Sequence, residues 1–145
     1  MPETKTTIIP HLTCRNCHEA IEFYQKAFGA TVQGVMDDKQ GRVMHASILI
    51  DGNPIYLHDE MPEWNALGPQ NLPTSPVTIH LQVPNVDEVF QKAADAGCEV
   101  KMPVEDQFWG DRYGTLKDPY GHSWSVATTV REVSREEIAA ALESF

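Results

Sequence analysis

The fold is decided by residues 77–100, VTIHLQVPNVDEVFQKAADAGCEV, because this stretch is a second copy of residues 9–32, IPHLTCRNCHEAIEFYQKAFGATV. His11 and His80 correspond in the two copies, 69 residues apart, and the same offset aligns the residues that open the helix of each copy. A repeat of one supersecondary unit predicts two modules of the same topology.

Each copy predicts a strand, a helix and three further strands, which together form a βαβββ module. Asn16 with Glu19, and Asn85 with Glu88, have the spacing of a capping box, and a glycine follows each helix. Alternating or β-branched runs indicate the strands. We expect strands at residues 6–14, 31–36, 43–50 and 54–58 with a helix at 18–28, and strands at residues 77–83, 98–102, 113–116 and 122–128 with a helix at 86–96.

The predicted fold class is α+β, with two paired βαβββ modules that form a curved mixed sheet around a concave pocket. One helix cannot cover both faces of a four-stranded sheet, so one face is left for a ligand. At 145 residues, the chain has the length of a single domain. We predict one domain over residues 1–145, with module one at 6–59, a linker at 60–76, module two at 77–129 and a C-terminal helix at 134–143.

The linker region differs in composition from both modules. Residues 59–76, DEMPEWNALGPQNLPTSP, contain four prolines in 18 residues, no hydrophobic periodicity and a single tryptophan, Trp64. Loops of this length are usually functional or disordered. Two interpretations stay open, a flap over a pocket and a mobile tether with Trp64 on its surface.

Charge and hydropathy exclude several classes of partner. The net charge of −10 argues against nucleic acid and against an anionic membrane surface, because both require clustered Lys and Arg. No apolar run approaches the ~20 residues that cross a bilayer, and residues 1–10 lack the apolar core of a signal peptide. We therefore expect a cytoplasmic protein.

The three cysteines are expected to be reduced and buried. Cys14, Cys17 and His18 match the CxxCH pattern of haem attachment, and a CxxC pair at a helix start is also found in redox proteins. The second module has Val83 and Val86 at the positions of the two cysteines, so the structure requires only small apolar residues there. We favour a packing role.

The most specific stretch is GDRYGTLKDPYGH, residues 110–122. Together with the paired modules it resembles the glyoxalase / bleomycin-resistance / extradiol-dioxygenase superfamily (vicinal oxygen chelate fold), and in particular its PhnB-like branch, over residues 7–138. The resemblance implies the fold, a pocket in a curved sheet and frequent homodimers. It implies no single reaction, because members include metal-dependent isomerases, dioxygenases, thiol transferases and metal-free drug-binding proteins.

The metal site of the superfamily's enzymes is absent at the positions that the resemblance implies. Those enzymes ligate a divalent metal from the first and last strand of each module. Aligned without gaps, the four positions are occupied by Ile9, Tyr56, Thr78 and Ser125. None of these side chains is a good ligand, since such sites use His, Glu, Asp or Cys.

Three histidines lie two residues further along the chain than three of these positions. Side chains two residues apart on a strand share a face, so His11, His58 and His80 follow Ile9, Tyr56 and Thr78 on the same side. Three imidazoles and a water could form a displaced catalytic metal site. The alternatives are a hydrogen-bonded pocket wall and a symmetric packing feature. For His45, strand alternation alone does not decide the face.

Two functions remain open. The first is a metal-free, dimeric protein that binds a small molecule in the sheet cavity, with a pocket lined by His11, Tyr56, His58, Trp64, Thr78, His80, Trp109, Arg112 and Ser125. The second is a metal-dependent lyase, isomerase or dioxygenase that uses one divalent ion held by the displaced histidines. Within the pocket set, Arg112 beside Asp111 could bind an anionic group or form an internal ion pair.

Overall fold

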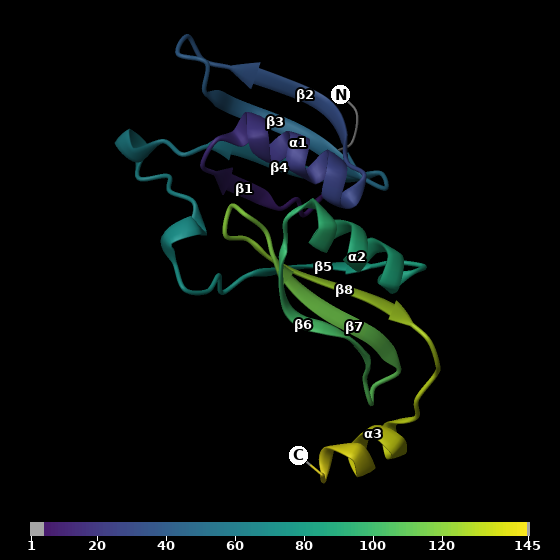
Figure 1. The fold of residues 1–145 in the computed structure, drawn as a ribbon. Coiled ribbons are helices and arrows are strands. Elements are labelled where there is room, and N and C mark those ends of the chain that lie inside the picture. The colour runs from purple at the N-terminus through teal and green to yellow at the C-terminus, as the bar shows by residue number, and fades with distance from the viewer. Residues whose placement is uncertain (1–4, 145) are drawn as a thin grey trace. The chain divides into compact units, whose positions relative to one another are not determined.

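The computed structural model describes residues 5–144, and the chain forms two compact units, one up to Pro69 and one from Gln70 onward. Each unit contains one four-stranded sheet with one helix packed on it (Figure 1). The α+β class and the repeated βαβββ topology are thereby confirmed. That the units form a single domain stays a prediction.

In the first unit, the sheet has the order β1-β4-β3-β2. Its two central strands are β4 and β3, and β1 runs parallel to β4 while the other neighbours are antiparallel. Helix α1 contacts β1, β3 and β4. The bounds are β1 (His11–Cys14), α1 (Cys17–Phe28), β2 (Thr31–Asp37), β3 (Val43–Ile50) and β4 (Asn53–Asp59).

The second unit repeats this arrangement with the order β5-β8-β7-β6. Strand β5 is parallel to β8, and helix α2 contacts β6, β7 and β8. The bounds are β5 (Thr78–Gln82), α2 (Val86–Ala96), β6 (Glu99–Asp106), β7 (Asp111–Lys117), β8 (Ser123–Thr129) and α3 (Arg135–Leu142). Of the described helices, none has both the length and the apolar character that a membrane crossing requires.

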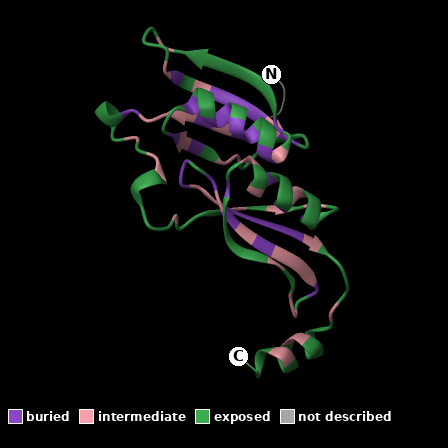
Figure 2. Ribbon diagram, in the orientation of Figure 1, coloured by how far each residue is buried: buried purple, intermediate pink, exposed green. Residues whose placement is uncertain are grey.

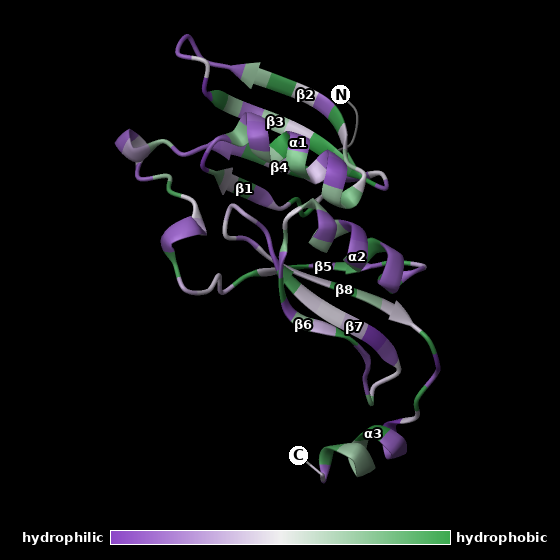
Figure 3. Cartoon of the chain, viewed as in Figure 1, coloured by the Kyte–Doolittle hydropathy of each residue, from purple (hydrophilic) through white to green (hydrophobic). Residues whose placement is uncertain are grey.

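The core of each unit lies between the sheet and its helix, as the buried residues in Figure 2 show. Alternate residues of each central strand point into it, and Figure 3 shows the corresponding change of hydropathy along the strands. On the first sheet, the helix-side residues are Leu12, Cys14, Ala46, Ile48, Ile55 and Leu57, all at most 7% exposed. The opposite face, which we call the helix-free face, carries the intervening residues.

All three cysteines are free thiols in this core. Cys14 and Cys17 are completely buried. Burial, reinforced by Asp59 and Asp37, raises the pKa of Cys17 to about 12, and burial with Asp118 does the same for Cys98. A thiol that stays protonated is a poor nucleophile, which agrees with a packing role.

The predicted capping box is correct for α2 and wrong for α1, and α3 also begins with a capping residue. Asn85 accepts a hydrogen bond from Glu88 N, and Ser134 accepts one from Glu137 N. Asn16 instead adopts a left-handed conformation (φ 62°), and its side chain caps no helical N–H. A residue from a distant strand, Asp59, takes over this role.

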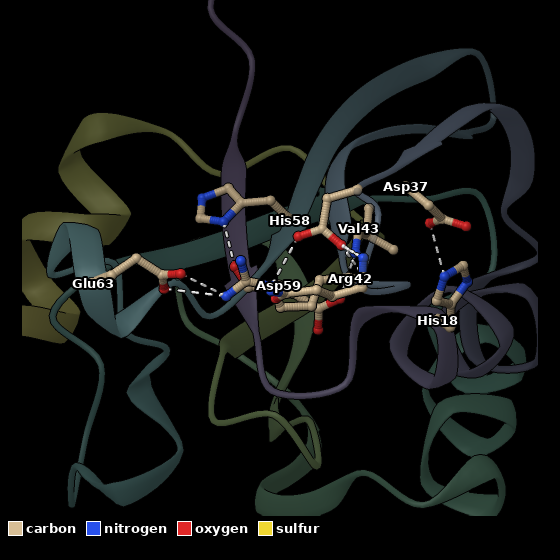
Figure 4. A network of polar contacts seen from close by, with 9 residues as sticks. His18, Asp37, Arg42, Val43, His58, Asp59 and Glu63 are labelled. Atoms are coloured by element: carbon tan, nitrogen blue, oxygen red, sulfur yellow. Dashed lines mark hydrogen bonds and ion pairs between the residues drawn. The ribbon is translucent and has the colours of Figure 1, made fainter.

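Asp59 ties the start of α1 to the start of β3. Its two carboxylate oxygens accept from Cys17 N and Val43 N, each at 2.7 Å (Figure 4). In the second unit Thr128, which is 69 residues further on, accepts from Val86 N at 2.8 Å. Both helices are thus capped by the last strand of their own sheet.

The first half of the linker region folds back on the first unit. Glu63, on the 3₁₀ turn η1 (Pro62–Trp64), binds Arg42 at 2.9 Å, and Arg42 also binds Asp38 in the turn before β3 (Figure 4). Glu60 accepts from Gly68 N at 3.1 Å. A second turn, η2 (Pro69–Asn71), follows. Whether this region acts as a flap stays a hypothesis.

Candidate functional site

The two units place candidate residues at matching positions of the sheet. The parallel pairing sets His11 opposite Tyr56 in the first unit and His80 opposite Ser125 in the second. These are the positions that the 69-residue offset aligns. Because paired residues share a face, each pair lies on the helix-free face of its own sheet.

In the first unit, four rings form one cluster, which we call the histidine patch: His11, His45, Tyr56 and His58. The ring centroid of His11 is 4.9 Å from that of His58 and 5.8 Å from those of both His45 and Tyr56. His45 and Tyr56 are 4.7 Å apart. All these contacts are edge-on, the arrangement that aromatic quadrupoles favour.

Hydrogen bonds hold His58 in one tautomer. Its Nδ1 lies 2.7 Å from the carbonyl oxygen of Asp59, which can only accept, so Nδ1 carries the proton. In the neutral ring, Nε2 then accepts from the hydroxyl of Thr13 at 3.1 Å. His58 therefore serves as a fixed wall of the patch.

His11 and His45 differ from His58 in the hydrogen bonds of their rings. Among the described residues, no hydrogen-bond partner is found for their ring nitrogens or for the Tyr56 hydroxyl. Burial, and then the neighbouring His58 and His45, lower the pKa of His11, so its neutral form is favoured. The patch thus offers two imidazoles and a phenol with unused donors and acceptors.

In the second unit, the equivalent residue, His80, belongs to a chain of hydrogen bonds. The carboxylate at one end of the chain decides which group donates and which accepts in the bonds that follow. The Asp111 carboxylate only accepts, so the Thr129 hydroxyl donates to it at 2.9 Å and must accept from Gln82 Nε2, also at 2.9 Å. Gln82 Oε1 then accepts from His80 Nε2 at 2.8 Å. His80 Nδ1 is left to accept from the Ser125 hydroxyl at 2.6 Å.

Aromatic rings extend this second cluster. Tyr113 stacks on His80 with centroids 6.1 Å apart, and Trp109 contacts Tyr113 edge-on at 5.7 Å. Trp109 also donates to Asp111 at 3.2 Å. Thr78 precedes His80 on the same face. The structure therefore brings Thr78, His80, Trp109 and Ser125 to the helix-free face of one sheet.

Arg112 and Trp64 lie elsewhere. Arg112 pairs with Thr128 in the ladder and points to the helix side. There its guanidinium donates two hydrogen bonds of 2.9 Å to Asp87 of α2 and one to Asp106. These carboxylates raise the pKa of Arg112, and Arg112 lowers that of Asp87. Trp64 lies on η1 with 65% of its surface exposed.

The histidines do not fit a metal ion as they are arranged. Within residues 5–144, no group of three or more His, Cys, Asp or Glu side chains is placed to hold one. Both ring nitrogens of His58 and of His80 are engaged in hydrogen bonds. A ligand needs a free nitrogen lone pair, so we assign no chemical step to a metal.

Sequence reasoning missed several members of these clusters. It left the face of His45 undecided and did not consider Thr13, Gln82 or Thr129. The repeat holds a usable signal for two of them, because the 69-residue offset aligns Thr13 with Gln82. Both residues bond a histidine of their own helix-free face.

Sequence comparison finds close relatives with no assigned activity. An uncharacterized protein of Mycobacterium bovis is 44% identical over 138 residues, covering 93% of this chain and 91% of the relative. A second, from Mycobacterium tuberculosis, is also 44% identical over 93% of this chain and 81% of its own length.

Solved structures share the fold at lower identity. TioX from Micromonospora has a TM-score of 0.67 at 19% identity, covering 87% of this chain and 100% of its own. The PhnB protein from Bacillus cereus has 0.67 at 21% (85% and 99%), and the fosfomycin resistance protein FosX from Listeria monocytogenes, with manganese and sulfate bound, has 0.65 at 18% (94% and 99%).

A family model matches residues 8–126, which include every strand of the first sheet and all of the second sheet except the last three residues of β8. Its description is the one that the GDRYGTLKDPYGH stretch and the paired modules led us to expect. The chain belongs to the Glyoxalase/Bleomycin resistance protein/Dioxygenase superfamily.

Proposed function

We propose that the protein binds a small organic molecule at the histidine patch of the first unit. One observation carries this proposal. The side chains of His11, His45 and Tyr56 have no hydrogen-bond partner among the described residues, whereas His80, the counterpart of His11, has both ring nitrogens bonded. Polar groups that the fold leaves unpaired on a ring-lined surface are suited to a ligand that supplies the missing partners.

The surroundings of the patch fit such a ligand. Ladder pairing places Met36 beside His45, and Leu49 two residues beyond Ser47 on the same face. A ligand would thus find apolar contact area next to a few polar groups, the usual composition of a small-molecule site. The family includes bleomycin resistance proteins by its description, and metal-free binding is consistent with the bonded state of His58.

The proposal extends to the other expected partners. We propose a homodimer, because every residue of the edge strand β2 is exposed and Val32, Val35 and Met36 are among the exposed apolar residues. Three free, buried thiols support a reducing compartment such as the cytoplasm.

A fragment screen by protein-observed NMR tests the binding proposal. Binders should shift the ring resonances of His11, His45 and Tyr56, and the double variant H11A/H45A should lose these binders. The matched control is His18→Ala, because His18 lies on α1 and pairs with Asp37 at 2.9 Å, away from the patch. If the screen yields binders that leave the patch resonances unchanged, the patch is not the ligand site.

A further inference from the structure

Among the described residues, the ladder positions on the helix-free face of the first sheet hold no Asp, Glu, Lys or Arg. Its members are alternate residues of the four strands, and their faces follow from the pairing of His11 with Tyr56, Ser47 with Tyr56 and Gly34 with Ser47. The full set is His11, Thr13, Thr31, Gly34, Met36, His45, Ser47, Leu49, Pro54, Tyr56 and His58. Histidine is the only titratable cation former among them.

Three acidic residues at the ends of β2 and β4 have partners away from the patch. Asp59 points its carboxylate to Cys17 N and Val43 N on the helix side. Glu60, on the loop after β4, accepts from Gly68 N and lies 3.4 Å from Arg15. Asp37 pairs with His18 of α1. An anion at the patch therefore meets no carboxylate at the ladder positions of its own face.

The second sheet shows the opposite pattern. Its helix-free face holds Asp111, whose register places it beside Thr129, together with Glu99 opposite Lys117 and Glu105 opposite Tyr113. Its histidine already has two partners. Although the net charge of the protein is −10, the ladder positions on the helix-free face of the first sheet hold no acidic residue. Three imidazoles and a phenol lie together on that face.

We infer that the ligand of the histidine patch carries a carboxylate, held by the N–H groups of His11 and His45 and the hydroxyl of Tyr56. This inference rests on the proposed function and names the class of its ligand. His11 touches both His45 and Tyr56, so one group can reach all three donors. A carboxylate offers about four lone pairs and accepts several donors at once, and hydrogen bonds to it are roughly twice as strong as neutral ones.

The same geometry argues for a single negative charge. Arg and Lys are the usual partners of a phosphate dianion, and neither occurs on this face. Burial, and then the neighbouring His58 and His45, lower the pKa of His11, and an anion between the rings opposes this shift because it favours the charged imidazole. Tyr56, Met36 and Leu49 supply contact area for an apolar body, so an aromatic acid fits better than acetate.

Three probes of similar shape test the inference on the full chain at pH 7. Benzoate is the carboxylate, benzamide its neutral isostere and phenyl phosphate the dianion. Dissociation constants come from NMR titration of the His11, His45 and Tyr56 ring signals. We expect benzoate to bind about tenfold tighter than benzamide, because the charge strengthens each hydrogen bond.

Two substitutions test whether the Tyr56 hydroxyl and the His11 ring cause the preference for benzoate over benzamide. Tyr56→Phe removes only the hydroxyl, and His11→Gln keeps a polar group of smaller reach; each should bring benzoate to within about threefold of benzamide. His18→Gln, the matched control, should leave both constants unchanged. Should Tyr56→Phe and His11→Gln retain the full preference, the donors are wrongly assigned and the inference falls.

The remaining outcomes separate the inference from the proposed function. Equal binding of benzoate and benzamide at the patch keeps a ligand site there and overturns the carboxylate. Tighter binding of phenyl phosphate overturns the monoanion. If none of the three probes shifts the patch signals, the inference is overturned, while the fragment screen decides the proposed function independently.

Discussion

The hydrogen bonds of the Asp59 carboxylate predict how the substitution Asp59→Asn changes the stability of the first unit. Replacing Asp59 by Asn keeps the size of the side chain but puts an NH₂ group where one carboxylate oxygen now accepts. Either Cys17 N or Val43 N, both 2.7 Å from the carboxylate, then faces a donor in place of an acceptor. The Asn16 side chain caps no helical N–H of α1, since its residue is left-handed and its Nδ2 donates to Glu19.

The magnitude follows from these two bonds. A hydrogen bond to a charged group contributes about 1.5–3 kcal/mol, and one such bond is lost while the other becomes neutral. The negative charge near the N-terminus of α1 adds roughly 0.3–1 kcal/mol through the helix dipole. We expect Asp59→Asn to lower the free energy of unfolding of the first unit by about 3 kcal/mol.

Native-state hydrogen exchange can localise this loss. Amides of α1, including Cys17 N, should exchange faster by about 100-fold in Asp59→Asn, since 1.4 kcal/mol corresponds to tenfold. Amides of α2 serve as an internal reference. The matched control is Asp51→Asn in the exposed β3–β4 turn, where φ is 47° and Asn tolerates the same conformation. Unchanged α1 exchange in Asp59→Asn would refute the capping argument.

Three further predictions concern packing, pH and assembly. Gly114→Ala should destabilise the second unit by about 1–3 kcal/mol in urea unfolding, because the new Cβ would lie 2.7 Å from Phe90 and 3.0 Å from Val104. Gly34→Ala, whose Cβ would have no atom within 4 Å, should change the free energy of unfolding little. Equal effects of the two substitutions would contradict the close packing at Gly114. The lowered pKa of His11 means that the unfolded state binds more protons as the pH falls below 6.5, so the free energy of unfolding should decrease there, and less so in His11→Gln. Identical pH profiles of unfolding would argue against a lowered His11 pKa. Light scattering should give the mass of two chains, and a mass of one chain would exclude the homodimer.

Much of the fold was readable from local sequence. The repeat, the strand alternation and the glycines after the helices predicted both modules, and β3 and α2 have the predicted bounds. The misjudged ends have long-range causes. Strand β1 begins at His11 and not at residue 6, because its ladder with β4 begins at the pair His11 and Tyr56. Strand β6 runs on to Asp106, because the hairpin with β7 continues.

The site was only partly readable. Alternation along a strand is local, so it correctly grouped His11 with His58 relative to the sheet face. The same rule places Arg112 on the side of Gly114 and Leu116, away from Ser125, but this required the register with β8. The face of His45 likewise required its pairing with Met36.

The sequence by itself determined the topology and the superfamily, because both depend on patterns within about thirty consecutive residues. Only the tertiary structure decided which histidine is free and which is bound. Thr13 reaches His58 and Ser125 reaches His80 across 45 residues each, and Asp59 reaches Cys17 across 42. Such partners lie on neighbouring strands, and their distance is set by sheet register, which no short stretch of sequence encodes.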